Sequence, residues 1–154
     1  MDLSNFEPVS HKGNTNDWYT PKWILDACGE FDLDPCGTPV WPTARTIFTK
    51  KDDGLTKKWF GRVWLNPPYG KNVGDWLHKL YCHGNGLALV FARTDTKWFQ
   101  EYAPKCSWIL FVSGRIKFVN SETLQITDRN PGAPSILMAF GEQAIPEIKG
   151  VRLV

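Results

Sequence analysis

Long hydrophobic runs are absent from this sequence. No apolar stretch approaches the length that spans a bilayer, and no secretory signal precedes the first acidic residue. Both absences argue against a membrane protein or a secreted protein. We therefore expect a protein that stays in the cytoplasm and has no membrane partner.

Cysteine is scarce and lacks a disulfide or metal-binding pattern. No C-x-x-C spacing occurs among the four cysteines, which are Cys28, Cys36, Cys82 and Cys106. We therefore expect free, mostly buried thiols. His78, Cys82 and His83 lie close together, but no fourth ligand is evident, so the sequence predicts no metal site.

Neither sign of charge dominates. The 18 lysines and arginines against 16 aspartates and glutamates leave a net charge of +2, which permits nucleic-acid binding without demanding it. With 42% hydrophobic and 22% charged residues, the composition is that of an ordinary globular protein. The 154 residues show neither repeats nor a linker, so we expect one domain, residues 18–154, after a flexible arm, residues 1–17.

Strand-like and helix-like patterns alternate along the chain. Helices are expected at 20–29, where Thr20 is the predicted cap and Pro21 the first helical residue, at 73–84, with Tyr81 on the apolar face, and at 96–103. Strands are expected at 31–34, 45–49, 61–65, 87–92, 108–112, 116–119 and 135–140, with a polar loop at 120–134. This order predicts an α/β sandwich with a mostly parallel sheet and a closing antiparallel hairpin.

The most informative motif is Asn66-Pro67-Pro68-Tyr69, which lies between a predicted strand and a predicted helix. Ligands bind at the carboxyl ends of strands in open α/β sheets. Two prolines remove two backbone N–H donors and leave carbonyl acceptors, to which the Asn66 amide oxygen adds another. Such a cluster, beside a flat aromatic ring, suits a planar –NH2 group. The motif therefore predicts an amine holder, with a proline-rich loop that merely ends the strand as the structural alternative.

Six separated blocks connect this chain with a known family. The blocks DWYTP, FDLDPC, DDGL, NPPYG, ARTDTKWF and GRIKF follow one another in the family's order. Together they resemble the small phage-type DNA adenine (N-6) methyltransferases, which are Dam-like enzymes with an NPPY motif. The resemblance implies a Rossmann-like class I methyltransferase fold, S-adenosyl-L-methionine as cofactor, DNA as partner and, for a phage-encoded protein, the bacterial host cytoplasm as location.

The resemblance also bears on the size of the sheet. Only 32 positions separate Asp34 from Asn66, which leaves room for about one further strand. One edge of the family's usual seven-stranded sheet is therefore expected to be trimmed. A chain of 154 residues also leaves no room for a separate target-recognition domain.

The resemblance implies roles for individual residues as well. The target adenine, extruded from the duplex for in-line methyl transfer, would be held by Asn66, Pro67, Pro68 and Tyr69. The cofactor would be bound by Tyr19, Thr20, Pro21, Asp34, Pro35, Cys36, Asp53, Gly54, Leu55 and Asn66. The nucleic acid would be contacted by Arg93, Thr94, Asp95, Arg115, Lys117 and Phe118, of which the last three are expected on the closing strands.

Three of the expected cofactor contacts are specific. The Asp34 carboxylate would accept from the methionine ammonium, the Asp53 carboxylate would accept from the adenine amine, and Thr20 would lie near the methionine carboxylate. Asp34 lacks the G-x-G loop of the wider methyltransferase pattern, because Gly37 is the only glycine nearby.

The amine chemistry leaves the acceptor open. An NPPY motif also fits RNA bases and the side chain of protein glutamine, because each presents a planar amine or amide. A non-catalytic DNA- or cofactor-binding module is the remaining alternative, against which the intact NPPYG block argues.

Overall fold

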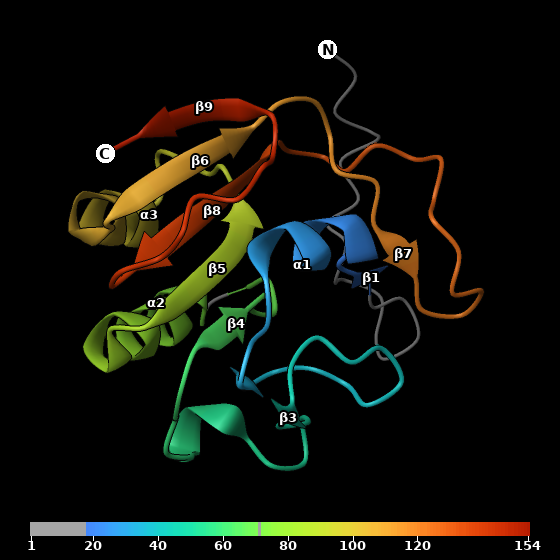
Figure 1. The fold of residues 1–154 in the computed structure, drawn as a ribbon, viewed down its shortest axis with the longest axis horizontal. Coiled ribbons are helices and arrows are strands. Elements are labelled where there is room, and N and C mark those ends of the chain that lie inside the picture. Colours follow the sequence, from blue (N-terminus) through green and yellow to red (C-terminus); the bar gives the residue numbers. More distant parts are fainter. Residues whose placement is uncertain (1–17, 71) are drawn as a thin grey trace.

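The computed structural model describes residues 18–70 and 72–154. A seven-stranded sheet runs through the described chain, with helices on both of its faces (Figure 1). The predicted arm, residues 1–17, lies outside the described residues.

One half of the sheet is parallel, so the sheet is mixed and not mostly parallel as the sequence predicts. From the edge inward it consists of β3 (Thr46–Ile47), β2 (Leu33–Asp34), β4 (Val63–Leu65) and β5 (Gly86–Phe91). Each of the four was expected as a strand. The strands β2 and β3 have only two residues each, so this edge of the sheet is short.

The other half of the sheet is antiparallel. The strand β8 (Ser135–Phe140) lies between β5 and β6 (Trp108–Val112) and runs antiparallel to both, and β9 (Gly150–Leu153) pairs with β6 at the far edge. The sequence predicts the bounds of β6 and β8 but misses β9. All four residues of β9 are exposed, so their sequence lacks the burial pattern that indicates a strand. The strand β9 brings the described sheet to seven strands despite its short β3–β2 edge.

Three α-helices of the described chain lie against the sheet. The helices α2 (Val73–His83) and α3 (Lys97–Tyr102) confirm the predicted segments. Gly84 ends α2 in a left-handed conformation that places its N–H on the Leu80 carbonyl, and the Thr96 side chain caps α3 by accepting from the Phe99 N–H. The helix α1 (Lys22–Cys28) starts later than predicted, because Pro21 occupies its cap position.

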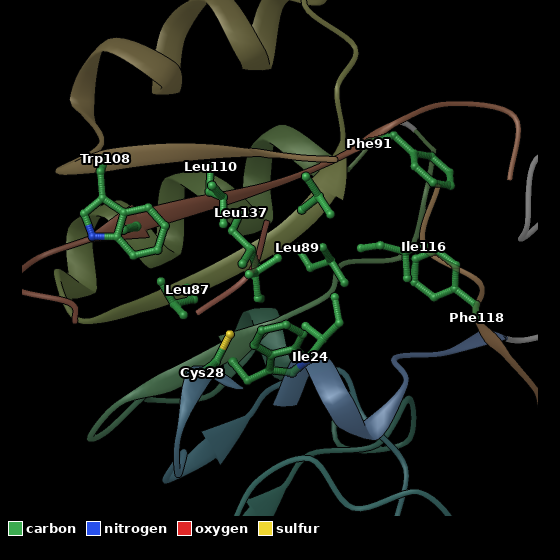
Figure 2. Close-up of a cluster of buried hydrophobic side chains, with 14 of the residues drawn as sticks. Ile24, Cys28, Leu87, Leu89, Phe91, Trp108, Leu110, Ile116, Phe118 and Leu137 are labelled. Carbon is green, nitrogen blue, oxygen red and sulfur yellow. The ribbon is translucent and has the colours of Figure 1, made fainter. Parts of the chain in front are cut away.

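Alternation along β5 explains why the sheet carries a core on each face. Leu87, Leu89 and Phe91 face the side of α1, and Ala88 and Val90 face the side of α2 and α3. Figure 2 shows the first of these clusters, with Ile24 and Cys28 of α1 directed at the sheet residues Leu87 and Leu89.

Two further predictions fail in the structure. The segment 116–119 is not a closing strand: only β7 (Val119–Asn120) forms there, and it pairs with β1 (Trp18–Tyr19) in a separate two-stranded sheet. Its alternating apolar residues Ile116 and Phe118 cover the core of the main sheet instead (Figure 2). Tyr81 is 42% exposed and therefore does not belong to the buried face of α2.

The mixed α/β sheet is compatible with a methyltransferase-like fold. Four parallel strands are followed by antiparallel strands, and the helices divide between two faces. Assignment to the Rossmann-like class stays a prediction.

Candidate active site

A cavity of about 760 Å³ opens where the strands β2 and β4 end. Small-molecule sites are commonly of about this size and occupy this end of an α/β sheet. The cavity brings together residues from four of the six sequence blocks, namely Tyr19, Thr20, Asp34, Pro35, Cys36, Asp53, Gly54, Asn66, Pro67, Pro68 and Tyr69. Distant parts of the sequence therefore meet at one cavity.

Two of the predicted cofactor residues lie outside the lining of this cavity. Pro21 is buried at the cap of α1. Leu55 lies in the short helix η3 (Gly54–Thr56) and packs against the core on the α2 side of the sheet.

Asn66 is held from two sides. Its side-chain nitrogen donates to the Thr20 hydroxyl over 3.3 Å, and the Cys36 thiol donates to its backbone carbonyl over 3.3 Å. Because the amide nitrogen engages Thr20, the amide oxygen at the other end remains an acceptor. The backbone carbonyl of Asn66 already accepts from Cys36, and the next main-chain carbonyl along the motif belongs to Pro67, which lacks an N–H.

The ring of Tyr69 is stacked on Phe91 at the end of β5. Their ring centroids are 4.5 Å apart with an angle of 10° between the ring planes. Tyr69 also lines the cavity. Burial raises the pKa of its phenol, so the group stays protonated and uncharged at neutral pH. The ring therefore presents a fixed aromatic wall.

Asp34 is a buried carboxylic acid at the end of β2. It is 4% exposed, and it accepts hydrogen bonds from the Thr43 hydroxyl and from the Cys36 backbone N–H over 3.0 Å. Burial raises its pKa to about 6, against the lowering effect of the two hydrogen bonds. A cationic ligand group would offset the cost of burying the charged carboxylate, which suits the predicted ammonium contact.

The Cys36 thiol stays protonated at neutral pH. Burial and the nearby Asp34 both raise its pKa well above the usual range. A protonated thiol is a hydrogen-bond donor, which accounts for its contact with the Asn66 carbonyl.

The DDGL block reaches the cavity through a close backbone contact. Asp53 adopts a left-handed conformation with φ of 54° immediately before η3. A Cβ on Gly54 would lie 1.9 Å from the Pro35 carbonyl oxygen, so only glycine allows this approach. The contact joins the loop after β2 to the loop that carries Asp53.

Trp41 is a cavity residue that the sequence analysis missed. Its indole N–H donates to the Thr20 carbonyl over 2.7 Å, and its ring is stacked on Tyr19 with centroids 5.9 Å apart. Trp41 lies in a turn-rich segment without periodicity, so no sequence pattern distinguishes it from a surface aromatic. Only the fold brings it to the site.

Comparison with known proteins gives the same family as the motifs. A family model described as DNA N-6-adenine-methyltransferase (Dam) matches residues 9–149. The chain belongs to the Dam family. It is also 28% identical over 144 residues to the DNA N-6-adenine-methyltransferase of Haemophilus phage HP1 (strain HP1c1), covering 86% of this chain and 83% of the relative. No solved structure matches the chain significantly.

A second, smaller cavity of about 300 Å³ collects several residues predicted for the nucleic-acid contact of this Dam-family chain. Arg93, Thr94, Asp95 and Arg115 line it, together with Ala92 and residues 132–134. The Arg93 guanidinium lies 5.9 Å from the centroid of the Phe91 ring, which in turn is stacked on Tyr69. The aromatic pair therefore connects the NPPY motif with this arginine-lined surface.

Two other predicted nucleic-acid residues lie elsewhere. Phe118 is 5% exposed and packs edge-on against Phe91 with centroids 6.4 Å apart, so it is a core residue and not a surface contact (Figure 2). Lys117 is exposed but does not line the smaller cavity. Both belong to the coil before β7, where alternation places the apolar side chain inward.

The described residues contain no group of three or more His, Cys, Asp or Glu side chains that could hold a metal ion. His78 and Cys82 approach each other, whereas His83 contacts the Gly61 carbonyl oxygen over 2.7 Å. The cysteines of the described chain are free. None of its helices has the length and apolar character that crossing a membrane requires.

Proposed function

We propose that this Dam-family chain transfers the methyl group of S-adenosyl-L-methionine to the exocyclic amine of adenine in DNA. The observation that carries the proposal is the hold on Asn66. With its amide nitrogen on Thr20 and its backbone carbonyl on Cys36, Asn66 has its amide oxygen left as an acceptor, and the next carbonyl along the chain is that of Pro67. These two acceptors would match the two hydrogens of an aryl amine.

The chain's own groups activate the amine by orienting it. The lone pair of adenine's amine nitrogen is delocalised into the ring, so the nitrogen is a poor nucleophile. Hydrogen bonds from both amine hydrogens, to Asn66 and Pro67, favour a tetrahedral nitrogen whose lone pair is directed away from the acceptors. No base is required beforehand, because the extra proton leaves to water after transfer.

The larger cavity fits the cofactor chemically. Asp34 is a buried acid whose raised pKa an ammonium would lower again, and Asp53 supplies a carboxylate on the opposite loop. The indole N–H of Trp64, in the cavity wall, is buried and has no hydrogen-bond partner within the described chain, a donor that a carboxylate ligand would satisfy. The bound cofactor would supply a methyl group on a positively charged sulfur.

The target base would reach the site from outside the duplex. An adenine within a base pair hides its amine, so it must be extruded into the protein. Tyr69 would stack on the extruded base, and Phe91 supports the ring from behind. The arginine-lined cavity, with Arg93 and Arg115, would hold backbone phosphates near the extruded nucleotide.

One labelling experiment tests this function. The protein would be incubated with methyl-labelled S-adenosyl-L-methionine and an equal mixture of duplex DNA, RNA and protein acceptors, and the products would be digested to nucleosides and amino acids. We expect label in N6-methyladenine from DNA and none in methylated cytosine. Label only in RNA or in glutamine would change the substrate, and no label in any acceptor would favour a non-catalytic binding module.

A further inference from the structure

We propose that Thr20 is a positioning residue, which turns the Asn66 side chain so that its amide oxygen is the end left for the substrate amine. This inference rests on the proposed function and assigns a role within the same site. It differs from the expected contact of Thr20 with the cofactor, because the partner of Thr20 in the structure is Asn66.

The orientation of Asn66 matters because its two ends have opposite hydrogen-bonding properties. An amide oxygen accepts from an amine, whereas an amide –NH2 offers only further donors. Rotation by half a turn would therefore face the substrate amine with the wrong group. The Thr20 hydroxyl receives the amide nitrogen over 3.3 Å, which leaves the oxygen at the opposite end of the group.

The main chain that carries the Thr20 hydroxyl is held firmly. Its residue is 2% exposed, and the indole N–H of Trp41 donates to its backbone carbonyl over 2.7 Å. On one side of Thr20, Tyr19 belongs to β1 and is in register with Val119 of β7. On the other side, Pro21 starts α1 and accepts from the Ile24 N–H over 3.1 Å. The position of the hydroxyl is therefore fixed, and in the structure it accepts from the Asn66 amide nitrogen.

Helix capping does not explain this hydroxyl. The cap position of α1 is Pro21, and no side-chain hydrogen bond caps that helix. The bond to Asn66 spans 46 residues of sequence and joins the start of α1 to the NPPY motif. The threonine side chain therefore serves the site and not the helix.

The test compares two replacements that differ by the hydroxyl. Thr20→Val keeps the size and branching of the side chain but removes the hydroxyl, and Thr20→Ser keeps the hydroxyl. We expect T20V to lower kcat for DNA methylation by about tenfold and T20S to stay within about threefold of the parent, because one neutral hydrogen bond is lost or kept. Calorimetric Kd values for S-adenosyl-L-methionine and melting temperatures should change little in either variant.

A double-mutant cycle separates positioning from general damage. If Thr20 acts through Asn66, T20V should lower the residual kcat of Asn66→Ala by less than about twofold, since the amide to be oriented is gone. An equal loss in both backgrounds would overturn the inference. A T20V effect confined to the Kd of the cofactor would also overturn it, because Thr20 would then act in cofactor binding.

A readout that is independent of activity keeps the two proposals distinguishable. In ¹⁵N-resolved spectra, the Asn66 side-chain amide is identified by its absence from Asn66→Ala. Its protons should exchange slowly with water in the parent and in T20S, and rapidly in T20V. Rapid exchange in the parent would overturn the inference even in an active enzyme. If the amide protons exchange slowly but no DNA is methylated, Thr20 still positions Asn66 and only the proposed reaction is wrong.

Discussion

At the scale of single residues, the proposed function gives the amine to Asn66 and the cofactor to other residues of the cavity. Asn66 touches the loop after β2 through Cys36 and the start of α1 through Thr20. Its free amide oxygen is the group on which the proposed chemistry depends.

Replacement of Asn66 by alanine should therefore act on turnover. We expect Asn66→Ala to lower kcat by about 100- to 1,000-fold, the usual effect of removing one preorganised polar partner, and to leave the cofactor Kd within about threefold. Steady-state methylation assays and calorimetry measure the two quantities. Asn72→Ala is a matched control, because Asn72 is exposed before α2 and its side chain makes no capping bond. Normal turnover in N66A would exclude the amine-holding role.

Asp34 carries a stability cost that depends on pH. Its pKa is raised from 3.8 to about 6 in the folded protein, so the unfolded chain ionises first and stability falls as pH rises between these values. Above about pH 6 the full cost is present. Asn in this position can keep both hydrogen bonds, since the Thr43 hydroxyl can accept as well as donate.

We therefore predict that Asp34→Asn is more stable than the parent at pH 7.5 and equally stable near pH 4, where the parent carboxyl is protonated. Urea unfolding at the two pH values measures the difference. The same variant should bind S-adenosyl-L-methionine at least about tenfold more weakly at pH 7.5, since it loses a charged partner. A parent protein that is stabilised by raising the pH from 4 to 6, relative to D34N, would contradict the buried-acid account.

At the scale of elements, η3 and its flanking loop are held in place by α2. The Lys79 ammonium donates to the carbonyls of Leu55, over 2.7 Å, and of Lys57, and lies 5.4 Å from the Trp59 ring. The Trp59 indole donates to the Gly54 carbonyl over 2.8 Å. These contacts fix the segment that presents Asp53 to the cavity.

Release of this segment should weaken cofactor binding and spare the chemical step. We expect Lys79→Met to raise KM for S-adenosyl-L-methionine by about three- to tenfold, because it removes a charged donor from two carbonyls but keeps the apolar stem. The kcat at saturating cofactor should stay within about twofold. Lys97→Met in α3 is the control, since Lys97 is exposed. A loss of kcat at unchanged KM would argue against a role of η3 in holding the cofactor.

At the scale of the whole molecule, the net charge of +2 is too small to attract DNA strongly. Positive side chains must therefore gather at the surface that meets the DNA. Arg115 is exposed, donates to the Pro131 carbonyl over 3.2 Å and lines the smaller cavity beside Arg93. Arg152 lies on β9, at the edge of the sheet opposite β3.

These two arginines should differ in their effect on DNA binding. We expect Arg115→Gln to weaken duplex binding by about three- to tenfold and to reduce the slope of log affinity against log salt by about one, as for one lost phosphate contact. Arg152→Gln should leave both values unchanged. Fluorescence anisotropy over a series of salt concentrations measures them. Equal effects of the two variants would argue against a local phosphate contact of Arg115 and for a diffuse electrostatic attraction between protein and DNA.

Local patterns in the sequence were enough to predict most elements and the family. Apolar periodicity depends on neighbours in sequence, so α2, β5, β6 and β8 could be predicted with nearly their observed bounds. The NPPY motif, the six blocks and their order are enough to identify the Dam family. The proposed contacts with cofactor and DNA, and residues 18–154 as one catalytic domain, stay predictions.

Tertiary structure decided the features that depend on distant partners. Phe118 alternates like a strand residue but fills the core beside Phe91, and β9 pairs with the edge that β6 offers. Trp41 is held at the site by Thr20 and Tyr19. Thr20 looked like a helix cap in sequence, but its partner is Asn66, 46 residues away. A sequence shows which groups a residue can bond with, whereas the choice among them depends on which group the folded chain brings within hydrogen-bonding distance.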